Sequence, residues 1–147
     1  MLRFLALAGV VLALDRLSKW WVVRTLALGE SLPLIPGVFH LTHVRNTGAA
    51  FSLFPNATLV LAVFSALVVG GLVVFAPRIQ ELGIKWELGL FLGGALGNLI
   101  DRVRDGAVVD FLDFRIWPVF NLADTALVIG VLIAGYRLLR AGEADRA

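Results

Sequence analysis

The sequence predicts a mainly α-helical integral membrane protein, a bundle of four spanning helices with a small β-sheet outside the membrane between the first two. Hydrophobic residues make up 59% of the 147 positions, charged residues only 16%, and the mean hydropathy is +0.89. Soluble domains are about half apolar and about a quarter charged. A small soluble protein of this composition would expose an unusually large apolar surface to water. The composition therefore argues against a soluble enzyme and against a disordered chain.

Four apolar stretches justify the four spans, because one span needs roughly 20 mostly apolar residues. We place them at about residues 2–23, 57–77, 84–103 and 118–138 of a single domain, 1–147. The second is the clearest, since Leu59 to Ala76 contains no charge, and we expect Pro77 and Arg78 to end it. The first leads into a charged segment without a small-residue cleavage site, which predicts a span rather than a cleaved signal peptide.

The polar segment of about residues 25–56, between the first two spans, predicts the sheet. Its turn-forming residues include Gly29, Pro33, Pro36 and Gly37. Val38 to Val44 is rich in aromatic and β-branched residues, which favours a short strand. His40 and His43 would point to opposite faces of that strand, so we expect them to be solvated or interfacial rather than metal ligands.

Four spans place both chain ends on one side of the membrane, opposite the polar segment and a second polar loop at 101–117. Six Lys or Arg residues fall on the terminal side and five on the other, and the short 77–86 loop and the basic last turn favour cytoplasmic termini. The tryptophans near the predicted span ends, as an interfacial belt requires, are Trp20, Trp21, Trp86 and Trp117.

The remaining composition excludes several kinds of site. The formal net charge of +2 is spread along the chain, so no nucleic-acid partner is predicted. The chain has no cysteine, which excludes a disulfide framework and a thiol nucleophile. No phosphate-binding glycine loop and no Ser-His-Asp set is recognisable, and the sequence predicts no metal and no cofactor.

Charged residues within the first span are functional candidates, because a charge in lipid is costly. Asp15 and Lys19 are four apart, acid first, and share a helix face, which favours an ion pair that makes both charges tolerable. Ser18 beside Lys19 suggests a serine-lysine peptidase dyad, but adjacent helical residues point about 100° apart. We therefore favour the ion pair.

The third span combines small residues with polar ones. Gly93 and Gly97 are four apart, which predicts close helix packing. Asn98 and Arg102 are also four apart and point the same way. The candidate partners of Arg102 are Asp101, Asp105 and a substrate carbonyl.

Asp124 lies six residues after Pro118, or about 9 Å along a helix, and so just below the membrane surface on the loop side. No basic residue stands near it in its own helix. One interpretation is a structural ion pair with Arg102 or Arg104. The other is a proton shared with a second carboxylate, and such a pair can activate water and protonate a leaving group, as in aspartic proteases.

Asp101 and Asp110 are the candidate partners of Asp124. Asp101 lies next to Arg102, which is expected to keep it ionised and engaged. Asp110, in Ala107-Val-Val-Asp-Phe111, has no adjacent base, so the physical argument favours Asp110.

The segment Asn46-Thr-Gly-Ala-Ala-Phe-Ser52 leads into the second span. Its small residues, Gly48 among them, let another backbone approach closely. Asn46 is suited either to bond the backbone of a peptide substrate or to cap a tight loop.

Five segments, occurring in this order, resemble the motifs of the lipoprotein signal peptidase (signal peptidase II) family. They are Asp15-Arg-Leu-Ser-Lys19, Asn46-Thr-Gly-Ala-Ala-Phe-Ser52, Gly93-Gly-Ala-Leu-Gly-Asn-Leu-Ile-Asp-Arg102, Val108-Val-Asp-Phe111 and Phe120-Asn-Leu-Ala-Asp124. Each alone is a weak signal, but five in order over nearly the whole chain are specific.

The resemblance implies a four-span aspartyl endopeptidase of the bacterial inner membrane. Such enzymes remove the signal peptide from diacylglyceryl-modified prolipoproteins, cutting just before the lipidated cysteine, and are inhibited by the cyclic peptide globomycin. The resemblance also implies that residues 25–56 form a small periplasmic sheet cradle. The catalytic pair would be Asp110 and Asp124. The residues that would bind substrate or support the site are Asp15, Lys19, Asn46, Gly48, Asn98, Arg102 and Asn121.

Two other classes of function remain open from the residues alone. A small transporter or channel would use Asp15 and Asp124 as proton or cation sites near the bilayer midplane. A non-catalytic lipid-binding or assembly protein would not need either carboxylate of the predicted pair.

Overall fold

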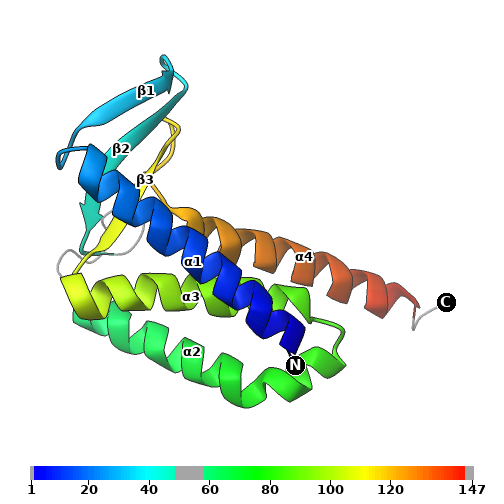
Figure 1. Ribbon diagram of the computed structural model, residues 1–147. Helices are drawn as coiled ribbons and strands as arrows, with labels where there is room; N and C mark the ends of the chain where they lie inside the picture. The colour runs from blue at the N-terminus through cyan, green and yellow to red at the C-terminus, as the bar shows by residue number, and fades with distance from the viewer. Residues whose placement is uncertain (1, 49–57, 145–147) are drawn as a thin grey trace.

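A computed structural model describes residues 2–48 and 58–144 and confirms a mainly helical fold with a small sheet (Figure 1). The helices are α1 (Leu2–Thr25), α2 (Thr58–Glu81), α3 (Trp86–Asp105) and α4 (Leu122–Ala144). The strands are β1 (Ser31–Ile35), β2 (Phe39–Asn46) and β3 (Val108–Asp113). The sheet stands at one end of the bundle, while α1 begins and α4 ends at the other (Figure 1).

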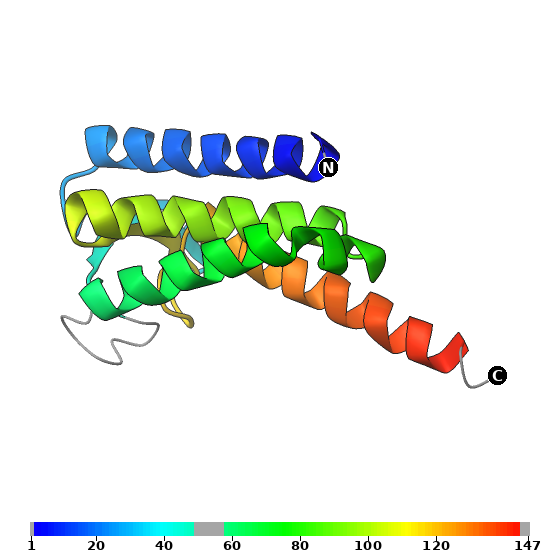
Figure 2. The ribbon, with the colours of Figure 1, turned by 90° about the horizontal axis from the view of Figure 1, so that it is seen from below.

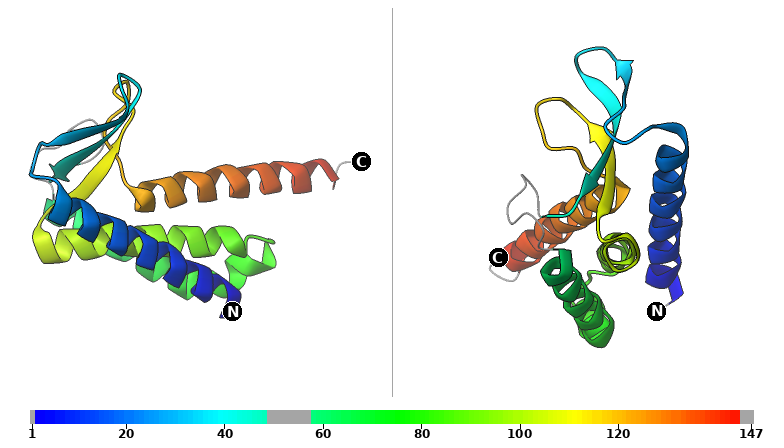
Figure 3. Two further views of the ribbon diagram at one scale, coloured as in Figure 1. Left: turned by 45° about the horizontal axis from the view of Figure 1, so that its top comes forward. Right: turned by 90° about the vertical axis from the view of Figure 1, so that its left-hand side faces the viewer.

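Helix α3 is the centre of the bundle and contacts each of the other three helices (Figures 2 and 3). Its glycines explain the close approach. A side-chain carbon at Gly93 would lie 2.7 Å from the carbonyl oxygen of Ala8 in α1, and one at Gly94 would lie 2.6 Å from that of Ala123 in α4. The close helix packing predicted for this glycine-rich segment is therefore confirmed on two of its sides.

Two helices, α2 and the Leu122–Arg140 part of α4, are long and apolar enough to cross a membrane by length and composition. Large apolar side chains of α2 are exposed: Leu59, Val60, Phe64 and Leu67 are each more than three-fifths accessible. Helices α1 and α3 have 24 and 20 residues, which give lengths of about 36 and 30 Å. Their charged residues are discussed below.

The sheet is antiparallel with strand order β1-β2-β3. Two of its strands come from the predicted polar segment, but β3 lies in 101–117, which we expected to be a loop. Val109 and Phe111 of β3 pack in one buried cluster with Val22 of α1 and with Leu26, the residue after that helix. This burial, together with the pairing to β2, explains why residues 108–113 form a strand. It also packs the sheet against the end of α1.

Three local predictions were wrong. Helix α4 begins at Leu122 rather than near residue 118, because Phe120 still pairs with Leu112 in a β-bridge. Helix α2 continues through Pro77 to Glu81, one turn past its predicted end. His43 is buried rather than solvated, and its Nδ1 forms a 2.9 Å hydrogen bond with the carbonyl oxygen of Leu26.

Candidate active site

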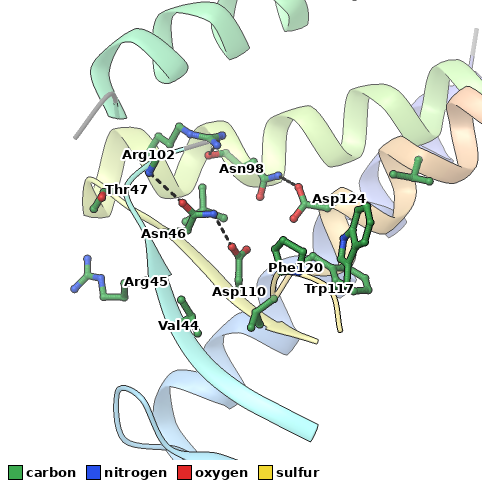
Figure 4. Close-up of a pocket in the computed structure, with 15 residues that line it drawn as sticks. Val44, Arg45, Asn46, Thr47, Asn98, Arg102, Asp110, Trp117, Phe120 and Asp124 are labelled. Atoms are coloured by element: carbon green, nitrogen blue, oxygen red, sulfur yellow. Dashed lines mark hydrogen bonds between the residues drawn. The ribbon is translucent and has the colours of Figure 1, made fainter. Parts of the chain in front are cut away.

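A cavity of about 590 Å³ lies where the sheet meets the ends of α3 and α4. Asp110 of β3 and Asp124 of α4 both line it (Figure 4). The lining also includes Asn46, Gly48, Asn98 and Arg102, which were predicted to bind substrate or support the site. The apolar lining residues include Val44, Val108, Trp117, Phe120 and Val128. The structure thus brings the two predicted carboxylates together with four of the predicted binding residues.

Asp110 is buried and held by two side-chain amides. Asn46 Nδ2 donates to its Oδ2 at 2.9 Å, as Figure 4 shows, and Asn121 Nδ2 donates to its Oδ1 at 2.6 Å. Burial, and secondarily the charge of Asp124, raises the pKa of Asp110 to about 7, although both amide hydrogen bonds act in the opposite direction. Asp110 is therefore able to change its protonation state near neutral pH.

Asp124 lies in the first turn of α4, closer to the helix start than predicted. Asn98 Nδ2 donates to its Oδ1 at 2.7 Å (Figure 4), and the backbone N–H of Asn121 donates to its Oδ2 at 3.2 Å. The Asn121 side chain in turn accepts a 2.9 Å hydrogen bond from the Asp124 N–H, so the two residues cap the helix reciprocally. Helix capping thereby fixes the orientation of a cavity residue.

Asn121 joins the two halves of the site. It is fully buried, and its Nδ2 contacts Asp110 Oδ1 and, at 3.2 Å, Asn98 Oδ1, while its backbone contacts Asp124. It connects both carboxylates without adding a charge. Its position one residue before α4 allows its backbone and side chain to face different partners.

Asp15 and Lys19 form the predicted ion pair, at 2.8 Å between Oδ2 and Nζ. Lys19 Nζ lies 2.8 Å from Asp101 Oδ2, and Arg16 also pairs with Asp101. Asp101 is therefore engaged as expected, but its partners come from α1 rather than from the adjacent Arg102. No local signal indicated Arg16, which lies 85 positions from Asp101.

Arg102 lines the cavity, and its Nη1 lies 3.5 Å from the backbone carbonyl oxygen of Asn98. Within residues 2–48 and 58–144, no basic side chain forms an ion pair with Asp110 or Asp124. The interpretation of Asp124 as the partner of Arg102 or Arg104 in a structural ion pair was therefore wrong. Arg104 instead lies 3.8 Å from Asp105.

Asn46 and Gly48 form a short turn at the cavity edge. The N–H of Gly48 donates to Asn46 Oδ1 at 3.0 Å, which leaves Asn46 Nδ2 directed at Asp110. The hydrogen bond from Gly48 therefore fixes the orientation of the Asn46 side chain, whose amide group donates to the Asp110 carboxylate. The rest of this predicted segment, residues 49–52, lies outside the described part of the chain.

The apolar wall of the cavity was missed from the sequence. Trp117, Phe120 and Val128 line it, but residues of these types also form cores and interfacial belts. No sequence signal separated them from such positions. Their presence gives the carboxylates an environment that is polar on one side and apolar on the other.

The chain is similar to proteins of known classification over nearly its full length. A family model described as signal peptidase (SPase) II matches residues 7–140. A lipoprotein signal peptidase of Moorella thermoacetica is 52% identical over 147 residues, 97% of each chain. One of Thermosynechococcus vestitus is 52% identical over 137 residues, 85% of this chain and 84% of that relative.

The chain is also similar in fold to solved structures of bacterial membrane enzymes. A solved bacterial membrane enzyme structure, obtained by the in meso method at 2.3 Å resolution, has a TM-score of 0.86 and 33% identity, covering 93% of this chain and 87% of that one. A second such structure, at 1.9 Å resolution, has a TM-score of 0.83 and covers 92% of each chain. This chain belongs to the signal peptidase II family.

Proposed function

We propose that this protein is an aspartyl endopeptidase that cleaves the signal peptide from diacylglyceryl-modified prolipoproteins, just before the lipidated cysteine. One observation carries the proposal: Asp110 and Asp124, from different elements, share one cavity and are connected by amides rather than neutralised by cations. Such a pair can hold a single proton between two carboxylates, which is the requirement for aspartic-protease chemistry.

The reaction needs one ionised and one protonated carboxylate. The ionised one takes a proton from water as the water oxygen attacks the scissile carbonyl carbon, and the protonated one donates a hydrogen bond to the carbonyl oxygen. When the C–N bond breaks, a proton passes from the pair to the departing amine. The two roles belong to the pair, which titrates as a unit.

The surrounding residues supply positioning. Asn98 donates a hydrogen bond to Asp124, and Asn121 donates one to Asp110. Asn46 of β2 donates a second hydrogen bond to Asp110. Arg102 and Gly48 line the cavity where a substrate backbone would run. Asp15 and Lys19 support the site through the 3.1 Å hydrogen bond from Lys19 Nζ to Asn98 Oδ1.

The location of the cavity suits a substrate anchored by lipid. It lies at the sheet end of the bundle, at the start of α4, where the scissile bond would sit while the acyl chains stay in the bilayer. We place the four helices across the bacterial inner membrane, with spans near those predicted, both termini in the cytoplasm and the sheet in the periplasm. Globomycin-type peptides would occupy the same cavity.

The test is cleavage of a lipidated precursor by Asp110→Asn and Asp124→Asn variants in detergent or proteoliposomes. Each should lose activity by about 10²- to 10⁴-fold or more, the contribution of a positioned acid or base. The matched control is Asp113→Asn, a carboxylate of the same strand that bonds Thr42 and Arg115 instead of lining the cavity.

Unfolding curves like those of the wild type would show that the Asn variants remain folded. If either variant turned over precursor at a rate near that of the wild type, or if the control lost activity equally, the catalytic pair would be ruled out.

A further inference from the structure

A second cavity, of about 400 Å³, lies between the sheet-side ends of α1 and α3, beneath β2 and β3. It shares only Arg45 with the catalytic cavity, and neither carboxylate of the proposed pair lines it. Its charged lining residues are Arg16, Lys19, Arg24, Arg45, Arg104, Asp101 and Asp105. Apart from Lys19, which supports the catalytic site through Asn98, none of its lining residues has a role in the proposed mechanism.

The lining carries an excess of positive charge. Five cationic side chains face two carboxylates, and the excess remains when Asp15, behind Lys19, is also counted. Asp101 is engaged by Arg16 and Lys19. Among the described residues, the guanidinium groups of Arg24, Arg45 and Arg104 form no short ion pair and can therefore bind an anion.

The contacts of these three groups leave donors available. Arg45 Nη2 donates a 2.7 Å hydrogen bond to the backbone carbonyl oxygen of Asp105. Arg104 Nε lies 3.8 Å from an Asp105 carboxylate oxygen. Arg24 stacks over the Trp20 ring at 4.6 Å. Each guanidinium carries five N–H donors, so most of them are not used by these contacts.

His43 adds a buried polar group to the cavity wall. Its Nδ1 must donate to the Leu26 carbonyl oxygen, since that oxygen only accepts. Its Nε2 is buried and has no hydrogen-bond partner in the described part of the chain. A buried nitrogen without a partner is costly. In the tautomer with Nδ1–H, Nε2 accepts, so a hydroxyl of a ligand headgroup, rather than a phosphate oxygen, would satisfy it.

The rim of the cavity is apolar on the α1 side. Trp20 and Val23 line it and are about half exposed, at 54% and 51%. A tryptophan with a basic residue beside it at the end of a spanning helix is typical of the headgroup level of a bilayer. Acyl chains could therefore lie against this rim while an anionic group faces the arginines.

We propose that this cavity binds the phosphate of an anionic phospholipid headgroup, such as that of phosphatidylglycerol. Arg24, Arg45 and Arg104 contact the phosphate oxygens, and the apolar rim contacts the first acyl segments. Free phosphate offers the same oxygens but no acyl chain, so it uses only the basic half of the site. The assignment is independent of the catalytic pair, because lipid binding needs no turnover.

The test is native mass spectrometry of the full chain in detergent, titrated with phosphatidylglycerol, with phosphatidylcholine of the same acyl chains, and with inorganic phosphate. Each Arg near a phosphate contributes about fivefold in affinity. The wild type should bind the first phosphatidylglycerol about tenfold or more tighter than phosphatidylcholine, and R24Q/R104Q should lose most of that preference.

The matched control is R78Q/R140Q, which removes two exposed arginines from the opposite end of the bundle, one of them stacked on Tyr136 as Arg24 is on Trp20. It should keep the preference. Equal affinity for the two lipids in the wild type, or equal loss in both double variants, would overturn the proposal. Displacement of the lipid by millimolar phosphate would assign the cavity to a free anion instead.

Discussion

Two groups of carboxylates lie side by side in this protein, all buried except the half-buried Asp124, and they differ in the groups that contact them. Asp15 and Asp101 share the ammonium group of Lys19, which lies 2.8 Å from an oxygen of each. Asp110 and Asp124 are held by asparagine amides. Asn98 separates the groups, since its Oδ1 accepts from Lys19 while its Nδ2 donates to Asp124.

The difference shows that burial alone does not determine what a carboxylate can do, because the partner decides whether its charge is offset. A cation at short range offsets the charge and fixes the side chains in one arrangement, which suits a structural role. Amides orient a carboxylate without neutralising it, so one carboxylate of a close pair is able to hold a proton. Burial, and secondarily the charge of Asp124, raises the pKa of Asp110 to about 7, because no cation among the described residues lies at ion-pair distance to offset them.

The largest effect should come from removing the cation of the first group. Lys19→Met keeps the length of the side chain but leaves Asp15 with only the backbone N–H of Ala123, at 3.0 Å, among its described hydrogen-bond donors. Breaking a buried ion pair from one side costs about 3–5 kcal/mol. We expect a loss of this size in the free energy of unfolding, measured by denaturant titration in detergent.

The companion variant for that comparison is Asp110→Asn in the second group. It removes a carboxylate that has no close cation and keeps a polar side chain of the same shape, so it should cost far less than Lys19→Met. Equal stability of Lys19→Met and the wild type would contradict the structural role of the first group.

A smaller effect is expected in the pH dependence of cleavage. In the proposed mechanism the pair works with one proton, and Asp110 loses its proton as pH rises through about 7. We therefore expect kcat/KM to fall about tenfold per pH unit well above pH 7, because the protonated form of Asp110 is lost there. Since its pKa is raised, this loss occurs on the alkaline side of neutral pH. Stopped assays of precursor cleavage between pH 5 and pH 9 measure it.

Asp113, three residues along the same strand, provides the contrast. Burial raises the pKa of Asp113, but hydrogen bonds from Thr42 and Arg115 outweigh it and hold the pKa below its ordinary value. Asp113→Asn should leave the alkaline limb in place. A flat profile in the wild type across this range would contradict the titration of the pair near neutral pH.

The sequence predicted the parts of this arrangement that depend on local spacing. The ion pair of Asp15 with Lys19 follows from a four-residue separation on one helix. The close contact at Gly93 follows from small residues on a helix that was predicted to span the membrane. The helical fold likewise follows from apolar runs of sufficient length.

The parts that were missed depend on residues far apart in the chain. Strand β3 pairs with β2, and Arg45 lies opposite Val109 across more than sixty positions, which no local pattern indicates. The pairing of Phe120 with Leu112 delays the start of α4 and places Asp124 in its first turn. Tertiary contacts therefore set the final geometry of the carboxylate pair, although its members were identifiable from the sequence.

The smallest effect tests the amides themselves. Asn46→Leu removes the 2.9 Å hydrogen bond to Asp110 Oδ2, a bond that favours the ionised form. One such bond is worth about 0.5–1.5 kcal/mol, which corresponds to about half to one pKa unit. The pKa of Asp110 should rise by that amount, and the alkaline limb of kcat/KM should move to higher pH in the same assay.

The control for this change is Val44→Ala. Val44 lies opposite Asp110 in the sheet and lines the same cavity, but its side chain donates no hydrogen bond. It should alter KM through lost apolar contact and leave the limb unmoved. A limb that moved to lower pH in Asn46→Leu, or moved equally in both variants, would mean that the amide does not control the protonation of the pair.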